Sequence, residues 1–178
     1  FERVFLVQIM KVSQLWCGHI EEHATTVQAG RTHLQTALPV TVGFWLGHIH
    51  NRFVSSAKRA KQLVMEVPGK FSGAVGTSAS QRLLMPKHEA EAHLMRKLRM
   101  PAANISTQVT PPEARARFYH ELMMLSGAMA NLGEDVRILQ SSQFGELGSA
   151  SSTSSAMSHK QANPIAAEQL AGMHTTVI

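Results

Sequence analysis

The sequence predicts an all-α protein, built as an elongated bundle of long helices. Three observations indicate this class: apolar residues recur at three- and four-residue steps, strand-like alternation is lacking, and proline and glycine separate the periodic stretches. Composition agrees, because aromatic residues make up only 6% of the 178 residues whereas methionine occurs 10 times. That mixture suits packed helices better than a β-sandwich.

Two long helices are predicted in the N-terminal part. The first extends to about Ala29, where Gly30 breaks its pattern, and its apolar face consists of Phe5, Ile9, Val12, Trp16 and Ile20. The second is predicted from about Val42 to Val67, with a stripe formed by Leu46, Ile49, Phe53, Ala57, Ala60 and Val64. Pro68-Gly69 ends it, and the Gly/Ser-rich residues 69–80 predict a loop.

Three more helices are predicted in the C-terminal part. A short one covers His88–Leu98, and the last one begins after Pro164. Between them, Pro111-Pro112-Glu113 is typical of a helix start. The helix that follows has apolar residues at alternating steps of four and three, the a and d positions of three heptads: Phe118, Leu122, Leu125, Met129, Leu132, Val136 and Leu139. We expect residues 1–178 to form one helical domain.

Composition also excludes several classes of protein. The single Cys17 excludes an intrachain disulfide framework and fits a reducing compartment, so we expect a cytoplasmic protein. No apolar run approaches the roughly 20 residues that span a bilayer, so no membrane is expected as a partner. The net charge is +5, but the basic residues are scattered without interleaved aromatics, so we expect no nucleic-acid partner. The chain begins with Phe1 rather than Met, and we expect it to be a fragment of a longer protein.

The break between the first two helices holds the first candidate for chemistry. Residues 30–43 read GRTHLQTALPVTVG and place His33 among hydroxyl and amide side chains. A histidine in such a break is a candidate proton donor or acceptor near neutral pH. The alternative is an exposed histidine beside a helix-terminal cap.

Three further segments carry polar side chains in loops. Residues 154–164, SSAMSHKQANP, offer hydroxyls, an ammonium and an amide on loose backbone, or else form a Ser/Gly/Ala linker. Residues 105–109, ISTQV, hold Thr107 and Gln108, or else cap a helix. Residues 69–77, GKFSGAVGT, lack the residue order of a phosphate loop, so we do not expect one.

Together these segments resemble conserved regions of the fumarase/aspartase superfamily. Residues 30–43 resemble the pattern Gly-Arg-Thr-His-x-Gln-x-Ala-x-Pro-x-Thr-x-Gly. Residues 154–164 resemble the signature Gly-Ser-Ser-x-Met-Pro-x-Lys-x-Asn-Pro, which places the signature loop at about 145–164. Residues 72–76, 106–108 and 136–140 are similar to the adenylosuccinate lyase branch. The resemblance covers the whole chain but only the central part of a family protomer.

The resemblance implies β-elimination across a succinyl C–N bond with release of fumarate. It makes Ser154 the base, with Ser155 as the alternative. His33, oriented by Glu168, would protonate the leaving nitrogen or anchor the substrate; Glu168 would otherwise only be a first-turn glutamate favoured by the helix dipole. Substrate binding is implied for Thr32, Thr107, Gln108, Lys160 and Asn163.

The resemblance further implies a dicarboxylate substrate, a homotetramer with shared active sites, and no cofactor. No metal is expected either, because His48 and His50 point in different directions on a helix. An adenylosuccinate lyase-like enzyme of purine biosynthesis is favoured, with a 3-carboxy-cis,cis-muconate cycloisomerase of aromatic degradation as the alternative. A catalytically silent helical scaffold is the third hypothesis, motivated by departures from the signature at Thr153, Ser158 and the extra Ala162.

Overall fold

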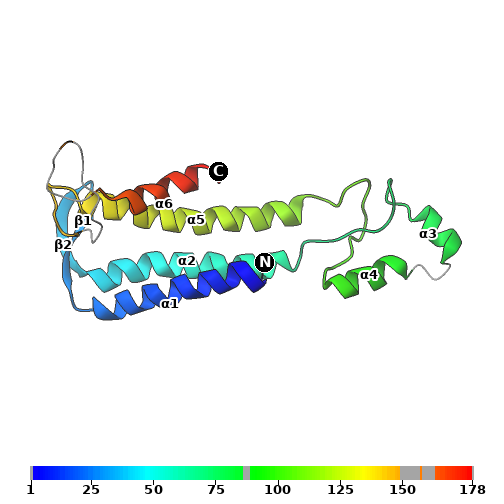
Figure 1. The fold of residues 1–178 in the computed structure, drawn as a ribbon, viewed down its shortest axis with the longest axis horizontal. Coiled ribbons are helices and arrows are strands. Elements are labelled where there is room, and N and C mark those ends of the chain that lie inside the picture. Colours follow the sequence, from blue (N-terminus) through cyan, green and yellow to red (C-terminus); the bar gives the residue numbers. More distant parts are fainter. Residues whose placement is uncertain (1, 86–88, 149–156, 158–162, 178) are drawn as a thin grey trace. The chain divides into compact units, whose positions relative to one another are not determined.

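The computed structural model describes residues 2–85, 89–148, 157 and 163–177. This part of the chain is mostly helical, as predicted, and its one sheet has two strands (Figure 1). None of the helices in the described ranges has both the length and the apolarity needed to cross a membrane. The elements in chain order are a π-helical turn Glu2–Leu6, α1 Val7–Glu22, β1 Val27–Thr32, β2 Gln35–Thr41, α2 Val42–Val64, α3 Ala79–Leu84, α4 Ala90–Leu98, α5 Glu113–Leu139 and α6 Ile165–Thr175.

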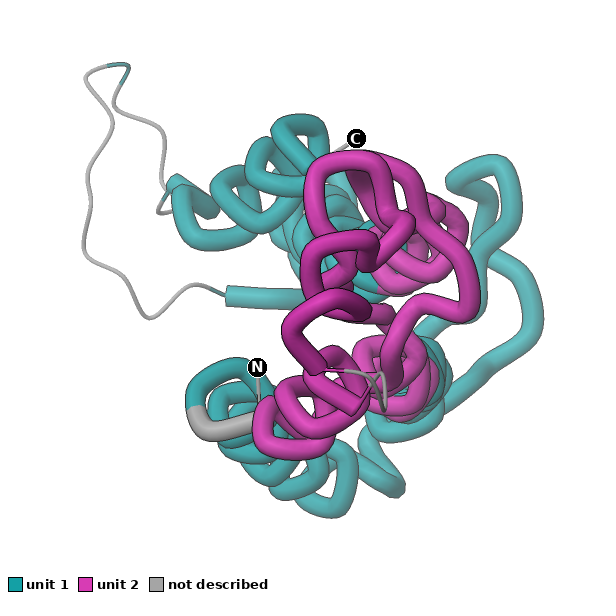
Figure 2. Tube along the Cα trace, turned by 90° about the vertical axis from the view of Figure 1, so that its right-hand side faces the viewer, with its two compact units in different colours: residues 1–57, 122–178 teal, residues 58–121 magenta. Residues whose placement is uncertain are grey.

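The chain divides into two compact units, which Figure 2 shows in different colours. Unit 1 consists of residues 1–57 and 122–178, and unit 2 consists of residues 58–121. The helices α2 and α5 each contribute residues to both units.

The core of unit 1 forms where α1, α2 and α5 pack together. Its buried members are Trp16, Ile49, Phe53 and Ala128, and the rings of Trp16 and Phe53 lie 5.7 Å apart between centroids. The partly buried residues around them belong to the three predicted apolar stripes or flank them: Ile9, Val12, Ile20, Trp45, Leu46, Val54, Leu125, Met129 and Leu132. Helical periodicity therefore identified the packing faces correctly.

The first helix ends earlier than predicted, and a β-hairpin follows it. The helix α1 stops at Glu22 and β1 pairs with β2 in antiparallel register, from Val27 opposite Thr41 to Thr32 opposite Gln35. Successive β-branched residues after the helix, Thr25 to Val27, favour extended backbone. Pro39 is tolerated because each strand of a two-stranded sheet has a free edge.

Two glycines permit close backbone approach around this hairpin. The register shifts between Ala29 and Arg31, and a Cβ on Gly30 would lie 2.5 Å from the carbonyl oxygen of Leu38. A Cβ on Gly43 would lie 2.6 Å from the carbonyl oxygen of Ile20, which brings the start of α2 against the end of α1. A larger residue at Gly30 would push the two strands apart, and one at Gly43 would push the start of α2 away from the end of α1.

Unit 2 is held together by loops as well as by helices. The amide of Gly69 donates to the carbonyl of Pro101 at 2.9 Å, and the amide of Ala103 donates to the carbonyl of Gly69 at 3.0 Å. Met95 of α4 is buried beside Gly69, whose Cβ would meet the Met95 sulfur. The loop predicted over residues 69–80 is correct for most of its length, but its last two residues open the short helix α3.

The helix α6 packs closely on the C-terminal part of α5 through a glycine. A Cβ on Gly133 would lie 2.5 Å from the carbonyl oxygen of Ala167 and 3.1 Å from the Cβ of Leu170. The hydroxyl of Ser126 on α5 lies 2.8 Å from Nδ1 of His174 on α6. These contacts fix the helix that carries Glu168.

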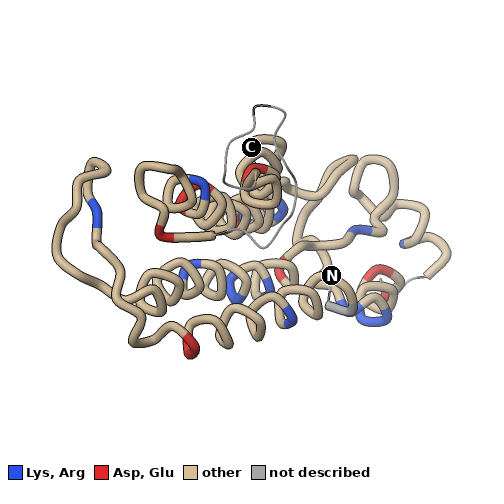
Figure 3. Tube along the Cα trace, turned by 60° about the vertical axis from the view of Figure 1, so that its left-hand side comes forward, with Lys and Arg blue, Asp and Glu red and all other residues tan. Residues whose placement is uncertain are grey.

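Lysine and arginine are spread over several elements, and α2 carries four of them, Arg52, Lys58, Arg59 and Lys61, without an acidic residue (Figure 3).

Candidate functional site

The tip of the hairpin presents the first two predicted site residues. Thr32 ends β1, and His33 and Leu34 form the two-residue turn to β2. Both turn residues have positive φ, 52° for His33 and 60° for Leu34, as a type I′ turn requires of its central residues. Neither is glycine, so this turn carries backbone strain, a feature that clusters at functional sites. Thr32 and His33 are both exposed.

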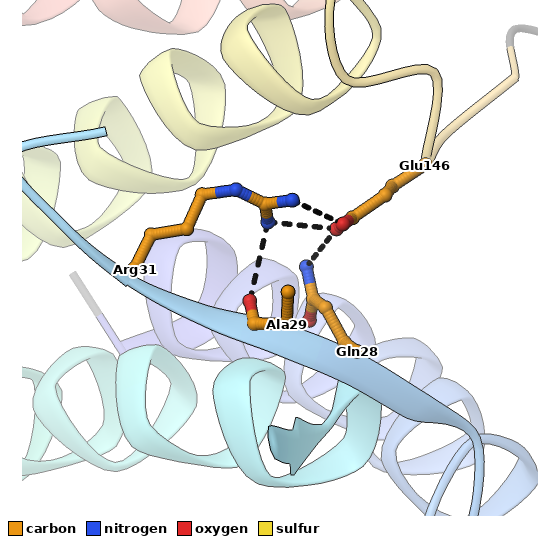
Figure 4. A network of polar contacts seen from close by, with 4 residues as sticks. All are labelled: Gln28, Ala29, Arg31 and Glu146. Atoms are coloured by element: carbon orange, nitrogen blue, oxygen red, sulfur yellow. Dashed lines mark hydrogen bonds and ion pairs between the residues drawn. The ribbon is translucent and has the colours of Figure 1, made fainter. Parts of the chain in front are cut away.

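An ion pair between Arg31 and Glu146 connects β1 to the segment after α5 (Figure 4). The guanidinium of Arg31 donates two hydrogen bonds to the carboxylate of Glu146, one of them of 2.9 Å from Nη1 to Oε2, and the amide of Gln28 donates a third of 3.3 Å. Arg31 also donates to the carbonyl of Ala29 at 3.1 Å and lies 4.6 Å above the ring of Phe144. Residue 146 therefore ties the predicted signature loop, about 145–164, to the strand that carries Thr32.

Electrostatics favours the charged form of both partners in this pair. The hydrogen bonds from Arg31 lower the pKa of Glu146 below its ordinary value, although desolvation acts in the opposite direction, and the Gln28 amide adds to the lowering. The hydrogen bond to Glu146 raises the pKa of Arg31. The pair is thus ionised throughout the neutral range.

A pocket of about 290 Å³ lies between the hairpin and the adjoining turns of α2 and α5. Arg31, Thr32 and His33 line it from the hairpin, and Trp45 and Asp135 line it from the helices. The indole Nε1 of Trp45 donates to Oδ2 of Asp135 at 2.8 Å, so the carboxylate is oriented. The lining of this pocket therefore includes a histidine, a hydroxyl and a guanidinium, which are groups that can bind or protonate an anionic ligand.

In unit 2 the structure brings two of the predicted segments together. The hydroxyls of Ser72 and Ser106 lie 3.0 Å apart, and Ser72 is buried. A Cβ on Gly76, whose φ is +78°, would lie 1.8 Å from the carbonyl oxygen of Ser106. Lys70 donates to the carbonyls of Gly73 at 2.5 Å and of Gln108 at 3.1 Å. The contacts fix the backbone of both loops and leave the side chains of the predicted Thr107 and Gln108 exposed.

The remaining predicted residues lie at the C-terminal end. Asn163 precedes α6, and Glu168 lies exposed in its first turn, with its amide donating to the carbonyl of Pro164 at 3.0 Å. Within the described part of one chain, no hydrogen bond or ion pair joins Glu168 to His33. The pairing of His33 with Glu168 stays a prediction, because the two residues could also pair between neighbouring chains.

Five signature-loop positions named in the sequence analysis lie outside the described residues, together with Lys160. They are Ser154 and Ser155, proposed as bases, and the departures Thr153, Ser158 and Ala162. Met157 is among the described residues of the signature loop, and its side chain is exposed.

Sequence reasoning missed the polar partners that position the site. Arg31 belongs to the recognised segment, but no role was predicted for it, and neither Glu146 nor Asp135 was considered. Each partner is at least 90 positions away in sequence from the residue it contacts, 115 for Arg31 and Glu146 and 90 for Trp45 and Asp135. A single sequence holds no local signal for such pairs. Nε2 of His50 lies 2.8 Å from the hydroxyl of Ser13.

A family model described as lyase matches residues 8–178 of the chain. The chain belongs to the fumarase/aspartase superfamily of lyases. It is 30% identical over 183 aligned residues to the adenylosuccinate lyase of Archaeoglobus fulgidus, an alignment that covers 98% of this chain and 40% of that relative.

Two solved structures are similar in fold. The fumarate lyase from Mesorhizobium sp. BNC1 has a TM-score of 0.77 and 29% identity, covering 95% of this chain and 37% of that one. The 3-carboxy-cis,cis-muconate lactonizing enzyme from Pseudomonas putida has a TM-score of 0.76 and 26% identity, covering 96% of this chain and 37% of that one. The chain thus spans about two fifths of the length of the proteins it matches.

Proposed function

We propose that the whole protein is a lyase that eliminates an amine from a succinyl group and releases fumarate, as an adenylosuccinate lyase does. The observation that carries this proposal is the similarity to adenylosuccinate lyases over 98% of the chain, together with the matching residues 30–43 and 154–164. Under this proposal the enzyme acts in purine biosynthesis in the cytoplasm.

The reaction needs a base for the proton on the carbon next to a carboxylate. In the proposed step Ser154, or else Ser155, takes this proton, the electron pair forms the C=C bond of fumarate, and the C–N bond breaks. A serine must lose its own proton before it can act, so positive charge and hydrogen-bond donors in the closed signature loop must lower the pKa of its hydroxyl. Lys160 and Asn163 hold a substrate carboxylate and stabilise the charge that develops on it.

The leaving nitrogen needs a proton, which we assign to His33. His33 lies at the tip of the hairpin and lines the pocket of about 290 Å³, so its imidazole is accessible to a ligand. Thr32, which precedes this turn, is proposed to contact the substrate, and the same role is proposed for Thr107 and Gln108.

We assign Glu168 to His33 as its orienting partner in a neighbouring copy of the chain, within a homotetramer whose subunits share active sites. A carboxylate hydrogen-bonded to the imidazole would fix its orientation and its tautomer. The proposal predicts complementation: mixed oligomers of two inactive variants, His33→Asn and Glu168→Gln, contain some sites with neither substitution and regain part of the activity. Mixtures that stay as inactive as each variant alone would contradict a pair shared between chains.

The alternative function is that of a 3-carboxy-cis,cis-muconate cycloisomerase, favoured by the similarity to the lactonizing enzyme. A substrate panel distinguishes the two: purified whole protein is incubated with adenylosuccinate and with 3-carboxy-cis,cis-muconate, and products are identified by chromatography. Fumarate and AMP in equal amounts support the lyase. A lactone from the second substrate alone supports the cycloisomerase, and inactivity toward both supports the silent scaffold.

A further inference from the structure

The last turns of α1 carry three metal-ligating side chains that the proposed reaction does not use. His19 and Glu22 lie in the last turn of α1 and His23 caps this helix, so the three side chains gather at its C-terminal end. One donor atom from each lies within 4.8 Å of the others. We propose that these three side chains bind a single Zn²⁺ ion at this corner of unit 1.

The distances between donor atoms are close to those of a zinc site. Oε2 of Glu22 lies 3.5 Å from Nδ1 of His19 and 3.9 Å from Nε2 of His23. Zinc bonds of about 2.0–2.2 Å in tetrahedral geometry separate neighbouring ligand atoms by about 3.3–3.6 Å. Small rotations of the exposed His19 and Glu22 side chains close the remaining difference. Three protein ligands leave the fourth position to water.

The ring of His23 is already oriented for this role. Its Nδ1 lies 3.3 Å from the hydroxyl of Thr26, so a neutral ring can donate there while Nε2 faces Glu22. A hydrogen bond from the second ring nitrogen is the usual support of a zinc-bound histidine. The carbonyl of His23 also accepts from the amides of Thr26 at 3.2 Å and Gly43 at 2.9 Å. The backbone of this ligand is therefore fixed where α1 joins the hairpin and α2.

The ligand set selects the metal. Two imidazoles and one carboxylate suit Zn²⁺ and its late first-row neighbours, whereas Mg²⁺ and Ca²⁺ prefer oxygen ligands. An ion bound only by the folded chain stabilises it by mass action. Because His23 lies at the corner that supports the hairpin, we expect zinc to stabilise the hairpin and not to supply chemistry to the proposed elimination.

The test measures zinc binding by the whole protein, purified without a polyhistidine tag and stripped with a chelator. Zinc is titrated against a chromophoric chelator, with His19→Gln and His23→Gln as test variants. The chain has 10 histidines, so a matched control is needed. His48→Gln supplies it, because His48 is an exposed helical histidine without a histidine, cysteine or carboxylate three or four residues away.

We expect the wild type and His48→Gln to bind one zinc per chain with equal affinity and to unfold at a higher temperature with zinc than without it. His19→Gln and His23→Gln should each bind zinc at least about tenfold more weakly and should lose the increase in unfolding temperature. Thr26→Val should weaken zinc binding by about tenfold. Circular dichroism without zinc verifies that each variant is folded, and Glu22→Gln replaces any variant that is not. Wild-type affinity in the ligand variants, or no saturable zinc binding by the wild type, would overturn the site.

Discussion

The ion pair between Arg31 and Glu146 gives the most quantitative test of the structure. Replacing Glu146 by Gln keeps the shape of the side chain but removes its charge. Hydrogen bonds to charged groups contribute about 1.5–3 kcal/mol. Since 15% of the Arg31 side chain and 27% of the Glu146 side chain are exposed, solvent screening reduces the expected loss. We expect Glu146→Gln to lower the free energy of unfolding by about 1–2 kcal/mol, or Tm by about 2–8 °C for a chain of this size.

The control is Glu134→Gln, which removes the other arginine–glutamate pair in the described part of the chain. Glu134 and Arg137 are spaced i, i+3 on α5, with side chains 50% and 41% exposed, so the expected loss is at most about 0.5 kcal/mol. Both losses are measured by urea unfolding. Equal losses for Glu134→Gln and Glu146→Gln would refute the idea that residue 146 anchors the hairpin.

The stability difference between the wild type and Glu146→Gln should depend on pH, and this dependence supplies an independent test. The pKa of Glu146 is lowered in the folded state, so the folded state binds fewer protons than the unfolded state as the carboxyl titrates. The pair therefore stabilises the wild type fully above the ordinary carboxyl pKa of about 4.3, and this stabilisation is lost as the pH falls through the lowered folded value. The stability difference between wild type and Glu146→Gln should be constant from pH 6 to 8 and shrink below about pH 4. A difference that persists unchanged at pH 3 would contradict the assignment.

Three further outcomes are expected. Gly133→Ala should destabilise the chain by about 1–3 kcal/mol, because its Cβ would lie 2.5 Å from the carbonyl oxygen of Ala167. Gly172→Ala, in open space on α6, should be neutral or slightly stabilising. Equal effects of the two substitutions in urea unfolding would count against the α5–α6 contact. Burial lowers the pKa of His50, so its contribution to stability is complete above the ordinary histidine pKa of about 6.5 and falls below it; His50→Gln should flatten the stability profile between pH 7 and 5, and an unchanged slope would contradict this. Lys160→Ala should raise KM and lower kcat for fumarate release, because its ammonium binds a charge present in the ground state, and steady-state kinetics with an unchanged KM would oppose that role.

Helix existence and packing faces could be predicted from sequence because they depend on local periodicity. The stripes that contain Trp16, Ile49 and Phe53 all contribute to the core, and α5 begins and ends where the Pro-Pro-Glu start and the heptads predict. The hairpin could not be predicted in this way. Its two strands are stabilised by pairing with each other, across a register shift between Ala29 and Arg31, and not by a repeating pattern in the sequence.

The candidate site was predictable only where a segment matches a family pattern. The structure adds how those segments are supported: Arg31 by Glu146, and the loop around Ser72 by Ser106. These contacts join positions 115 and 34 residues apart, so neither periodicity nor local spacing indicates them. The structure also shows His19 and His23 together at the C-terminal end of α1, a spacing that the sequence analysis did not consider while it discussed His48 and His50.

The most direct test of the proposed function is the kinetics of fumarate release by Ser154→Ala and Ser155→Ala in the whole protein. The base acts on a proton in the transition state and does not bind the ground-state substrate. Removing it should therefore lower kcat by orders of magnitude while KM stays nearly unchanged. We predict this result for Ser154→Ala, or for Ser155→Ala if the second serine is the base. Near-normal fumarate release by both variants, from a wild type that is active on adenylosuccinate, would contradict the signature-loop mechanism.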